Sequence, residues 1–160
     1  MNVSFTVHGV PVPQGSKRAL VHRSTGRAVV IEQGGARHRD WRADVKAAAA
    51  EAMPGSGSRS GYPLPITGPV GVSICFTVPK PKSAPKTRRT WPDKRPDLDK
   101  LVRAVLDAIT GEVIADDAQV VLLMVSKCFP GEPVTGDAVG PGAWCLDRPG
   151  CRVMVWQVEA

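Results

Sequence analysis

Two pairs of carboxylates flank one predicted helix. Asp97 and Asp99 lie in the segment P-D-L-D-K, and Asp116 and Asp117 lie in A-D-D-A-Q. Because a helix, a turn and a strand are predicted in succession here, we expect the two pairs to fold toward each other. Clustered carboxylates repel one another unless protons or a cation neutralise them. Oxygen ligands suit a hard cation such as Mg²⁺, with Mn²⁺ as a substitute, and such an ion can activate water and hold a phosphodiester.

Each of these acids also has an ordinary structural interpretation. Asp97 follows Pro96 and is a natural helix N-cap. Asp99 suits the positive end of the helix dipole. Asp116 and Asp117 are residues typical of turns. The residue types alone therefore leave a metal site and a set of caps and turns both open.

Two cations lie close to these acids in the sequence. Arg103 follows Asp99 by four residues and precedes Asp107 by four, so the three share one helical face. They can form a surface ladder worth about 0.3–0.5 kcal/mol per ion pair, or Arg103 can stabilise charge at a scissile phosphate. Lys127 can do the same work or simply extend its charged end to water. For Asp107 we expect a structural role.

Positive charge is concentrated before the first acid pair. Residues 1–95 contain 16 Lys/Arg and 5 Asp/Glu, and the Pro-rich loop 80–96 leads directly into Asp97. This distribution favours a polyanion partner such as DNA over a merely solvated surface, although both stay open. Trp91 in this loop can stack on an unpaired base, but packing in the core is the favoured interpretation. The residues expected to contact DNA are Lys17, Arg18, Arg23, Lys86, Arg88, Arg89, Lys94, Arg95, Lys100 and Lys127.

The elements that must position these residues follow from hydrophobic periodicity and turn residues. We expect one domain over residues 1–160, of the α+β (mixed α/β) class, with the order β-α-β-α-β-β. A long loop with a short hairpin around Ser24–Gly26 follows the first strand. A flexible connector is expected at about 53–66, and a Gly/Pro-rich insertion at 129–150. The expected strands are 3–9, 68–79, 118–128 and 151–158, and the expected helices are 37–52 and 98–110.

Composition excludes several classes of protein. The chain has 160 residues, of which 42% are hydrophobic, so it can bury a core and is not disordered as a whole. It contains no apolar run of the ~20 residues that span a membrane, and no signal peptide is recognised, so we expect a cytoplasmic location. The four cysteines are too sparse for a disulfide scaffold. Cys145 and Cys151 can bridge a hairpin or share a metal with Cys128 or a histidine, although zinc sites usually have tighter spacing.

The segment RPDLDKLVRAVLDAITGEVIADDAQVVLLMVSK resembles the core of RusA-type Holliday junction resolvases, small endonucleases of bacteria and their prophages. The resemblance is strong over residues 95–128 and weaker at strand 68–79 and at V-H-G-V-P-V-P-Q-G-S-K-R near the N-terminus. It implies a homodimer that binds four-way DNA junctions in recombination and repair and nicks two opposed strands with Mg²⁺.

The resemblance also implies roles for individual residues. The two acids of the family's D-x-D motif correspond to Asp97 and Asp99, and its essential acid at the D-D turn corresponds to Asp117, with Asp116 beside it. A functionally important helix lysine corresponds to Arg103, which keeps the charge but presents a planar guanidinium. Lys100 replaces a common asparagine. Asp97, Asp99, Asp117 and Asp116 are thus the expected metal ligands, and Asp97, Asp99, Asp117 and Arg103 the expected catalytic residues.

Two other functions compete with this one. The chain can be a DNA-binding module without catalysis, in which the acids only cap and turn. It can also be a metal-dependent nuclease that acts on other branched substrates. Substitution of Asp97 or Asp117 by asparagine distinguishes the first alternative, because only a nuclease loses cleavage while retaining junction binding.

Overall fold

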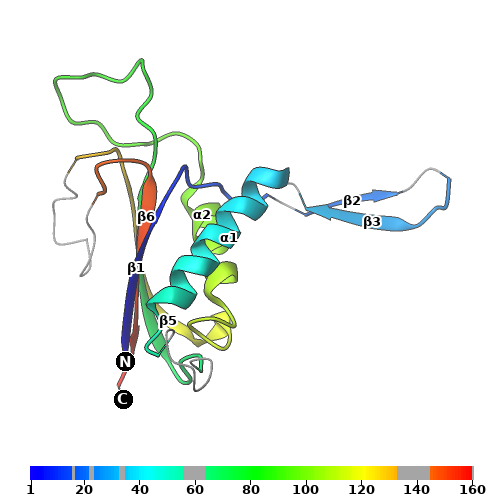
Figure 1. Ribbon diagram of the computed structural model, residues 1–160. Helices are drawn as coiled ribbons and strands as arrows, with labels where there is room; N and C mark the ends of the chain where they lie inside the picture. The colour runs from blue at the N-terminus through cyan, green and yellow to red at the C-terminus, as the bar shows by residue number, and fades with distance from the viewer. Residues whose placement is uncertain (16, 22–23, 33–34, 56–63, 133–144, 160) are drawn as a thin grey trace.

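The computed structural model (Figure 1) describes residues 1–15, 17–21, 24–32, 35–55, 64–132 and 145–159, with only the backbone described for 17–21 and 28–32. A mixed four-stranded sheet has the strand order β1-β6-β4-β5, and only β4 and β5 run parallel. The strands are β1 (Asn2–His8), β4 (Val70–Thr77), β5 (Val120–Cys128) and β6 (Gly150–Gln157). A separate antiparallel hairpin joins β2 (Lys17–Val21) to β3 (Ala28–Glu32).

Both helices cover the same face of this sheet (Figure 1). They are α1 (Gly35–Ala52) and α2 (Leu98–Ile109). Alternation of buried and exposed side chains along β1 turns Val3, Phe5 and Val7 toward the helices. All eight residues of the central strand β4 are buried. The core therefore lies between the helices and the sheet.

The helix α2 connects the parallel strands β4 and β5, as a crossover between parallel strands requires. Its apolar residues recur along one face, so Leu101, Val105 and Ile109 are buried while Arg103 is exposed. Because α2 returns antiparallel to the strands, it begins where β4 ends and finishes near the beginning of β5. This direction determines which site residues can meet.

Several predictions from the sequence are confirmed. The predicted hairpin around Ser24–Gly26 exists, although β2 and β3 add two strands to the predicted order, which is wrong in that respect. Both predicted helices and all four predicted sheet strands are present, with ends displaced by a few residues. No helix in the described part of the chain is long and apolar enough to cross a membrane.

Only the two ends of the expected connector at 53–66 belong to the described residues. Met53 and Ile66 at its ends are buried, and Ile66 N–H donates to Val113 O at 2.7 Å. Residues 56–63 between them lie outside the described residues, as do residues 133–144 of the expected insertion.

Candidate active site

The first turn of α2 carries two exposed carboxylates. Asp97 has the backbone conformation of an N-cap, but its side chain makes no capping hydrogen bond. Its Oδ2 lies instead 3.0 Å from Lys100 Nζ, one helical turn later. Asp99, in the first turn, is also exposed. The predicted N-cap position is therefore confirmed, while the carboxylate itself stays available to solvent and ligands.

Positive charge surrounds Asp97. The hydrogen bond and charge of Lys100 hold the pKa of the Asp97 carboxyl below its ordinary value, and the charges of Arg95 and Lys127 lower it further. The carboxylate is thus ionised at neutral pH, as a metal ligand must be. A divalent cation arriving here competes with the Lys100 ammonium for the same oxygens.

Lys127 holds the loop that precedes the acids. Its Nζ donates to Lys94 O at 2.8 Å and to Pro96 O at 2.9 Å, from the carboxyl end of β5. Of the two roles left open for Lys127, mere extension of its charge into water is excluded, because two carbonyl groups hold the ammonium. Lys127 thereby connects the sheet to the residue immediately before Asp97.

The segment that leads to the β2–β3 hairpin also docks at this end of α2. Gln14 is buried, and its N–H donates to Lys100 O at 3.0 Å. The hairpin beyond it extends away from the sheet and helices (Figure 1). Lys17 and Arg18 belong to β2, but their side chains, like all of Arg23, lie outside the described residues. Their contact with DNA remains a prediction.

The second acid pair has a different environment. Asp116 Oδ1 accepts from Ala118 N–H at 2.8 Å, and Gln119 Oε1 accepts from Asp116 N–H at 2.8 Å. This capping box starts the short 3₁₀ turn Asp117–Gln119. Gln119 Nε2 further donates to Gly68 O at 2.7 Å, which anchors the turn beside β4. Asp116 therefore has the structural role considered for it, whereas the Asp117 carboxylate is exposed.

The expectation that the two acid pairs converge within one chain is wrong. The 12 residues of α2 span about 18 Å along the helix axis, with Asp97 before the first and Asp117 well beyond the last. From Val120 to Lys127, β5 rises by about 23 Å, and Lys127 lies at the Asp97 end. In Figure 1 the green loop before α2 lies at one end of the sheet and the yellow turn before β5 at the other. A helix between two motifs separates them by its length. Here the chain runs back along the helix only after Asp117, in β5.

Arg103 lies on the exposed surface of α2, between the two ends. Within the described residues it forms no ion pair, so the predicted ladder with Asp99 and Asp107 is absent. Its guanidinium is thus not committed to a carboxylate of its own helix. The interpretation in which Arg103 meets a phosphate stays a prediction.

The basic loop before α2 is largely exposed. Trp91 is 54% exposed, so its predicted packing in the core is wrong. The Arg89 guanidinium lies 4.2 Å from the centre of the Trp91 ring, a cation–π arrangement. Lys80 is the exception, because it pairs with Glu132 at 2.6 Å. The exposed cations of this loop that were expected to contact DNA are Lys86, Arg88, Arg89, Lys94 and Arg95.

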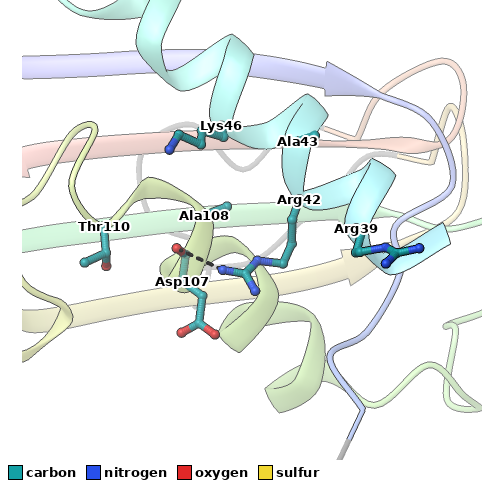
Figure 2. Close-up of a pocket in the computed structure, with 7 residues that line it drawn as sticks. All are labelled: Arg39, Arg42, Ala43, Lys46, Asp107, Ala108 and Thr110. Carbon is teal, nitrogen blue, oxygen red and sulfur yellow. Dashed lines mark hydrogen bonds between the residues drawn. The ribbon is translucent and has the colours of Figure 1, made fainter. Parts of the chain in front are cut away.

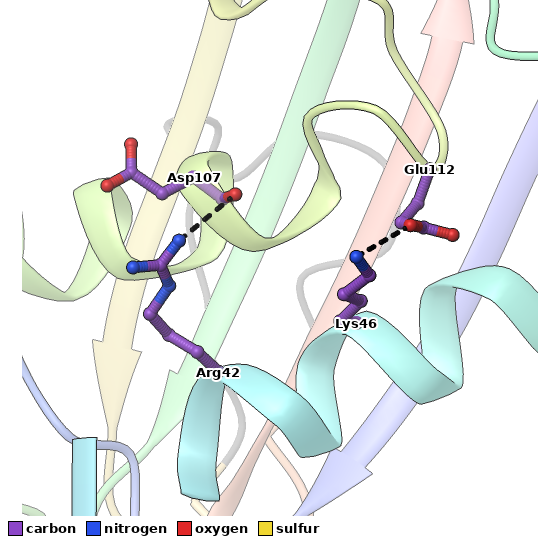
Figure 3. A network of polar contacts seen from close by, with 4 residues as sticks. All are labelled: Arg42, Lys46, Asp107 and Glu112. Carbon is purple, nitrogen blue, oxygen red and sulfur yellow. Dashed lines mark hydrogen bonds and ion pairs between the residues drawn. The ribbon is translucent and has the colours of Figure 1, made fainter. Parts of the chain in front are cut away.

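A cavity of about 260 Å³ between α1 and α2 contains none of the predicted acids Asp97, Asp99, Asp116 and Asp117. Its charged walls are shown in Figure 2. Arg42 Nη2 donates to Asp107 O at 3.5 Å, near the carboxyl end of α2. The negative end of the helix dipole stabilises a cation at this position. Lys46 pairs with Glu112 at 3.0 Å beside it (Figure 3). The first contact joins α1 to the backbone of α2, and the second joins α1 to the turn that follows α2. The structural role expected for the Asp107 side chain stays a prediction.

The cysteines are paired differently from the prediction. Cys128 and Cys145 form a disulfide, and Cys75 and Cys151 are free and buried. Cys151 is paired with Val7 and Phe76 in the sheet and faces the helices, whereas Cys75 faces the opposite side. A bridge or shared metal between Cys145 and Cys151 is therefore wrong, because the sheet separates them.

Sequence reasoning missed an exposed apolar edge next to the second acid pair. Val121, Leu122 and Leu123 of β5 are 57%, 51% and 46% exposed. β5 is an edge strand of the sheet, so within the described part of the chain its outer backbone groups have no neighbouring strand. An apolar run in a strand usually indicates burial on both faces, and only the strand order reveals that this one lies at an edge.

Comparisons with known proteins agree with these observations. A protein-family model described as "Endodeoxyribonuclease RusA" matches residues 9–136, a range that includes both acid pairs, Arg103 and Lys127. The chain is also 30% identical, over 140 residues, to a protein of Bacillus subtilis (strain 168) described as "Uncharacterized protein YqaN". That alignment covers 82% of this chain and 90% of the relative.

Proposed function

Because the chain belongs to the RusA endodeoxyribonuclease family, whose members resolve Holliday junctions, we propose that it is a Mg²⁺-dependent homodimer that cuts four-way DNA junctions by paired symmetric nicks. The chain is an endodeoxyribonuclease by its family. The observation that carries the finer proposal is the first turn of α2. There two exposed carboxylates adjoin a basic loop that Lys127 holds in place.

The oxygen donors fit a hard cation. Asp97 and Asp99 would hold it together with an Asp117 from a second copy of the chain, and the Asp116 beside that Asp117 would contribute its second oxygen. When bound, Mg²⁺ supplies a water of lowered pKa and neutralises charge on the phosphate. The protein contributes position: Lys127 fixes the loop before Asp97, and the exposed Arg103 is available to a phosphate oxygen as negative charge develops there.

The distance between the acid pairs supports a site made by two copies. One chain separates Asp97 from Asp117 by the length of α2, which is about 18 Å, so one ion cannot bind both. Two β5 strands lying antiparallel about a two-fold axis would reverse one copy relative to the other. Asp117 of the partner subunit would then lie near Asp97 and Asp99. The symmetry of a dimer makes two such sites, which suits two opposed cuts.

The exposed edge of β5 is a suitable contact for that second copy. Val121, Leu122 and Leu123 follow Asp117 closely and are each about half exposed. Burial of apolar surface stabilises association by about 25 cal/mol per Å², and strand pairing would satisfy the outer backbone groups of β5. The apolar edge and the divided acid pairs therefore favour the same arrangement.

The first experiment follows cleavage of a labelled four-way junction and a linear duplex in Mg²⁺ and in EDTA. We expect paired nicks in the junction only, and only with Mg²⁺. Preferential cutting of flaps or forks would instead favour a nuclease for other branched substrates. Tight junction binding without cutting in either condition would favour the binding-module alternative.

In a second experiment, two inactive variants, Asp99→Asn and Asp117→Asn, are unfolded, combined and refolded together so that mixed dimers form. If each site takes Asp99 from one copy and Asp117 from the other, a mixed dimer has one site with both acids intact. We expect single nicks to return while paired nicks stay absent. Native mass spectrometry shows whether mixed dimers have formed. If they have formed and the mixture is still as inactive as either variant alone, the shared site is refuted.

A further inference from the structure

Three cysteine sulfurs lie together at the carboxyl end of β4 and β5, on the sheet face opposite the helices. Cys75 Sγ lies 3.8 Å from Cys128 Sγ, and Cys128 is bonded to Cys145. All three sulfurs lie within 4.8 Å of one another. They come from β4, from the last residue of β5 and from the segment before β6, so tertiary structure alone unites them.

The backbone brings these cysteines together without help from the disulfide. Sheet pairing places Cys75 beside Ser126, two residues from Cys128, and Val78 N–H donates to Cys128 O at 2.9 Å. The residue after Cys145 is held on both sides. Leu146 N–H donates to Thr77 Oγ1 at 2.9 Å, and Leu146 O accepts from Gly131 N–H at 2.9 Å. Reduction of the disulfide would therefore leave three thiols at one place.

We propose that Cys75, Cys128 and Cys145 form a zinc site in the reduced protein. A small thiol first reduces the disulfide: two R–SH molecules give R–S–S–R and two cysteine thiols. Zn²⁺ then binds three thiolates as three protons leave to solvent. A Zn–S distance of 2.3 Å in a tetrahedron separates neighbouring sulfurs by about 3.8 Å, and Cys75 and Cys128 have this separation. Cys145 is only half-buried, which leaves the fourth position to water.

The three sulfurs already lie close enough together to bind one ion, since all are within 4.8 Å of one another. Soft thiolate ligands also select zinc over the hard cation expected at the carboxylates, so the two sites do not compete for one ion.

The position of the cluster gives zinc a consequence for the rest of the molecule. Cys128 directly follows Lys127, whose ammonium holds the carbonyl groups of Lys94 and Pro96. An ion bound at Cys128 would stabilise this end of β5, and with it the loop that leads into Asp97. The zinc site is thus a structural support behind the carboxylates.

The test uses the full chain, reduced with a phosphine and freed of metal. Co²⁺ serves as a spectroscopic probe, since thiolate ligation produces a charge-transfer band, and native mass spectrometry gives the zinc stoichiometry. We expect one metal ion to bind per chain, and we expect added Zn²⁺ to displace the bound Co²⁺. Serine at any one of the three positions should weaken zinc binding by more than about 100-fold, beyond the usual cost of a change outside the ligand shell. Cys151→Ala is the matched control, because that thiol lies on the other face.

Two results would overturn the proposal. One is a reduced wild-type chain that binds no zinc, which leaves the disulfide as the cluster's whole function. The other is zinc binding that persists in Cys75→Ser and Cys145→Ser, which would assign the ion to other ligands. Because the first result concerns the wild-type chain, it is decisive even if a variant fails to fold.

Discussion

The acids at the two ends of α2 differ in the contacts that they make within the chain. At the amino end, Asp97 is paired with Lys100 and surrounded by cations of the basic loop and β5. At the other end, Asp116 is used by a capping box and Asp117 is left exposed beside an apolar strand edge. One end carries positive charge around its carboxylate, and the other carries an exposed apolar strand edge. This difference is the main support for a site divided between two copies.

The largest expected effect tests the amino end. Asp99→Asn should reduce junction cleavage by at least about 10³-fold, because a metal ligand supplies several kcal/mol of transition-state stabilisation. Junction binding should persist, since one negative charge near the phosphates is lost. Cleavage time courses and gel-shift titrations measure the two effects. Asp107→Asn, on the same helix, is the control, and an equal loss there would contradict a specific role for Asp99.

The next effect tests the other end. Val121→Lys places a charge on the exposed apolar edge of β5. It should raise the dissociation constant of the dimer by about 10- to 100-fold, through the loss of buried apolar contact. Sedimentation velocity over a range of concentrations measures this change. A dimer unaffected by the lysine would move the interface away from β5.

A smaller effect concerns the connection between sheet and acids. Lys127→Ala removes two hydrogen bonds to the carbonyl groups before Asp97. Cleavage should fall by about 10- to 100-fold, because small displacements of catalytic groups are costly. The loss should appear in kcat more than in KM, and Lys127→Arg should recover part of it. A change confined to KM would indicate instead that Lys127 contacts DNA directly.

The smallest expected effect tests how the positive charge near Asp97 changes the affinity for Mg²⁺. Lys100→Ala removes the ammonium that is bonded to Asp97. Mg²⁺ should then bind about two- to five-fold more tightly, as expected for loss of a weak exposed ion pair. Isothermal titration with catalytically inactive protein, or the Mg²⁺ dependence of cleavage, gives the affinity. Weaker binding after this substitution would mean that Lys100 organises the site rather than competing for it.

Local patterns in the sequence were enough for the helices and most strands. The apolar spacing of Leu101, Val105 and Ile109 predicted α2 to within one residue at its carboxyl end. The run of glycine and turn residues around Ser24–Gly26 predicted a hairpin. These features depend on residues a few positions apart, where helical and strand periodicity act directly.

The sequence by itself determined which side chains are available, namely two pairs of carboxylates and a basic loop, and it indicated the family to which the chain belongs. Only the tertiary structure decided which groups meet. It separated Asp97 from Asp117 by the length of a helix, joined Lys127 to the loop before Asp97 and gathered Cys75 with Cys128 and Cys145. The reason is that strand order and helix direction depend on how much apolar surface the whole core buries. A short segment of sequence does not determine that quantity.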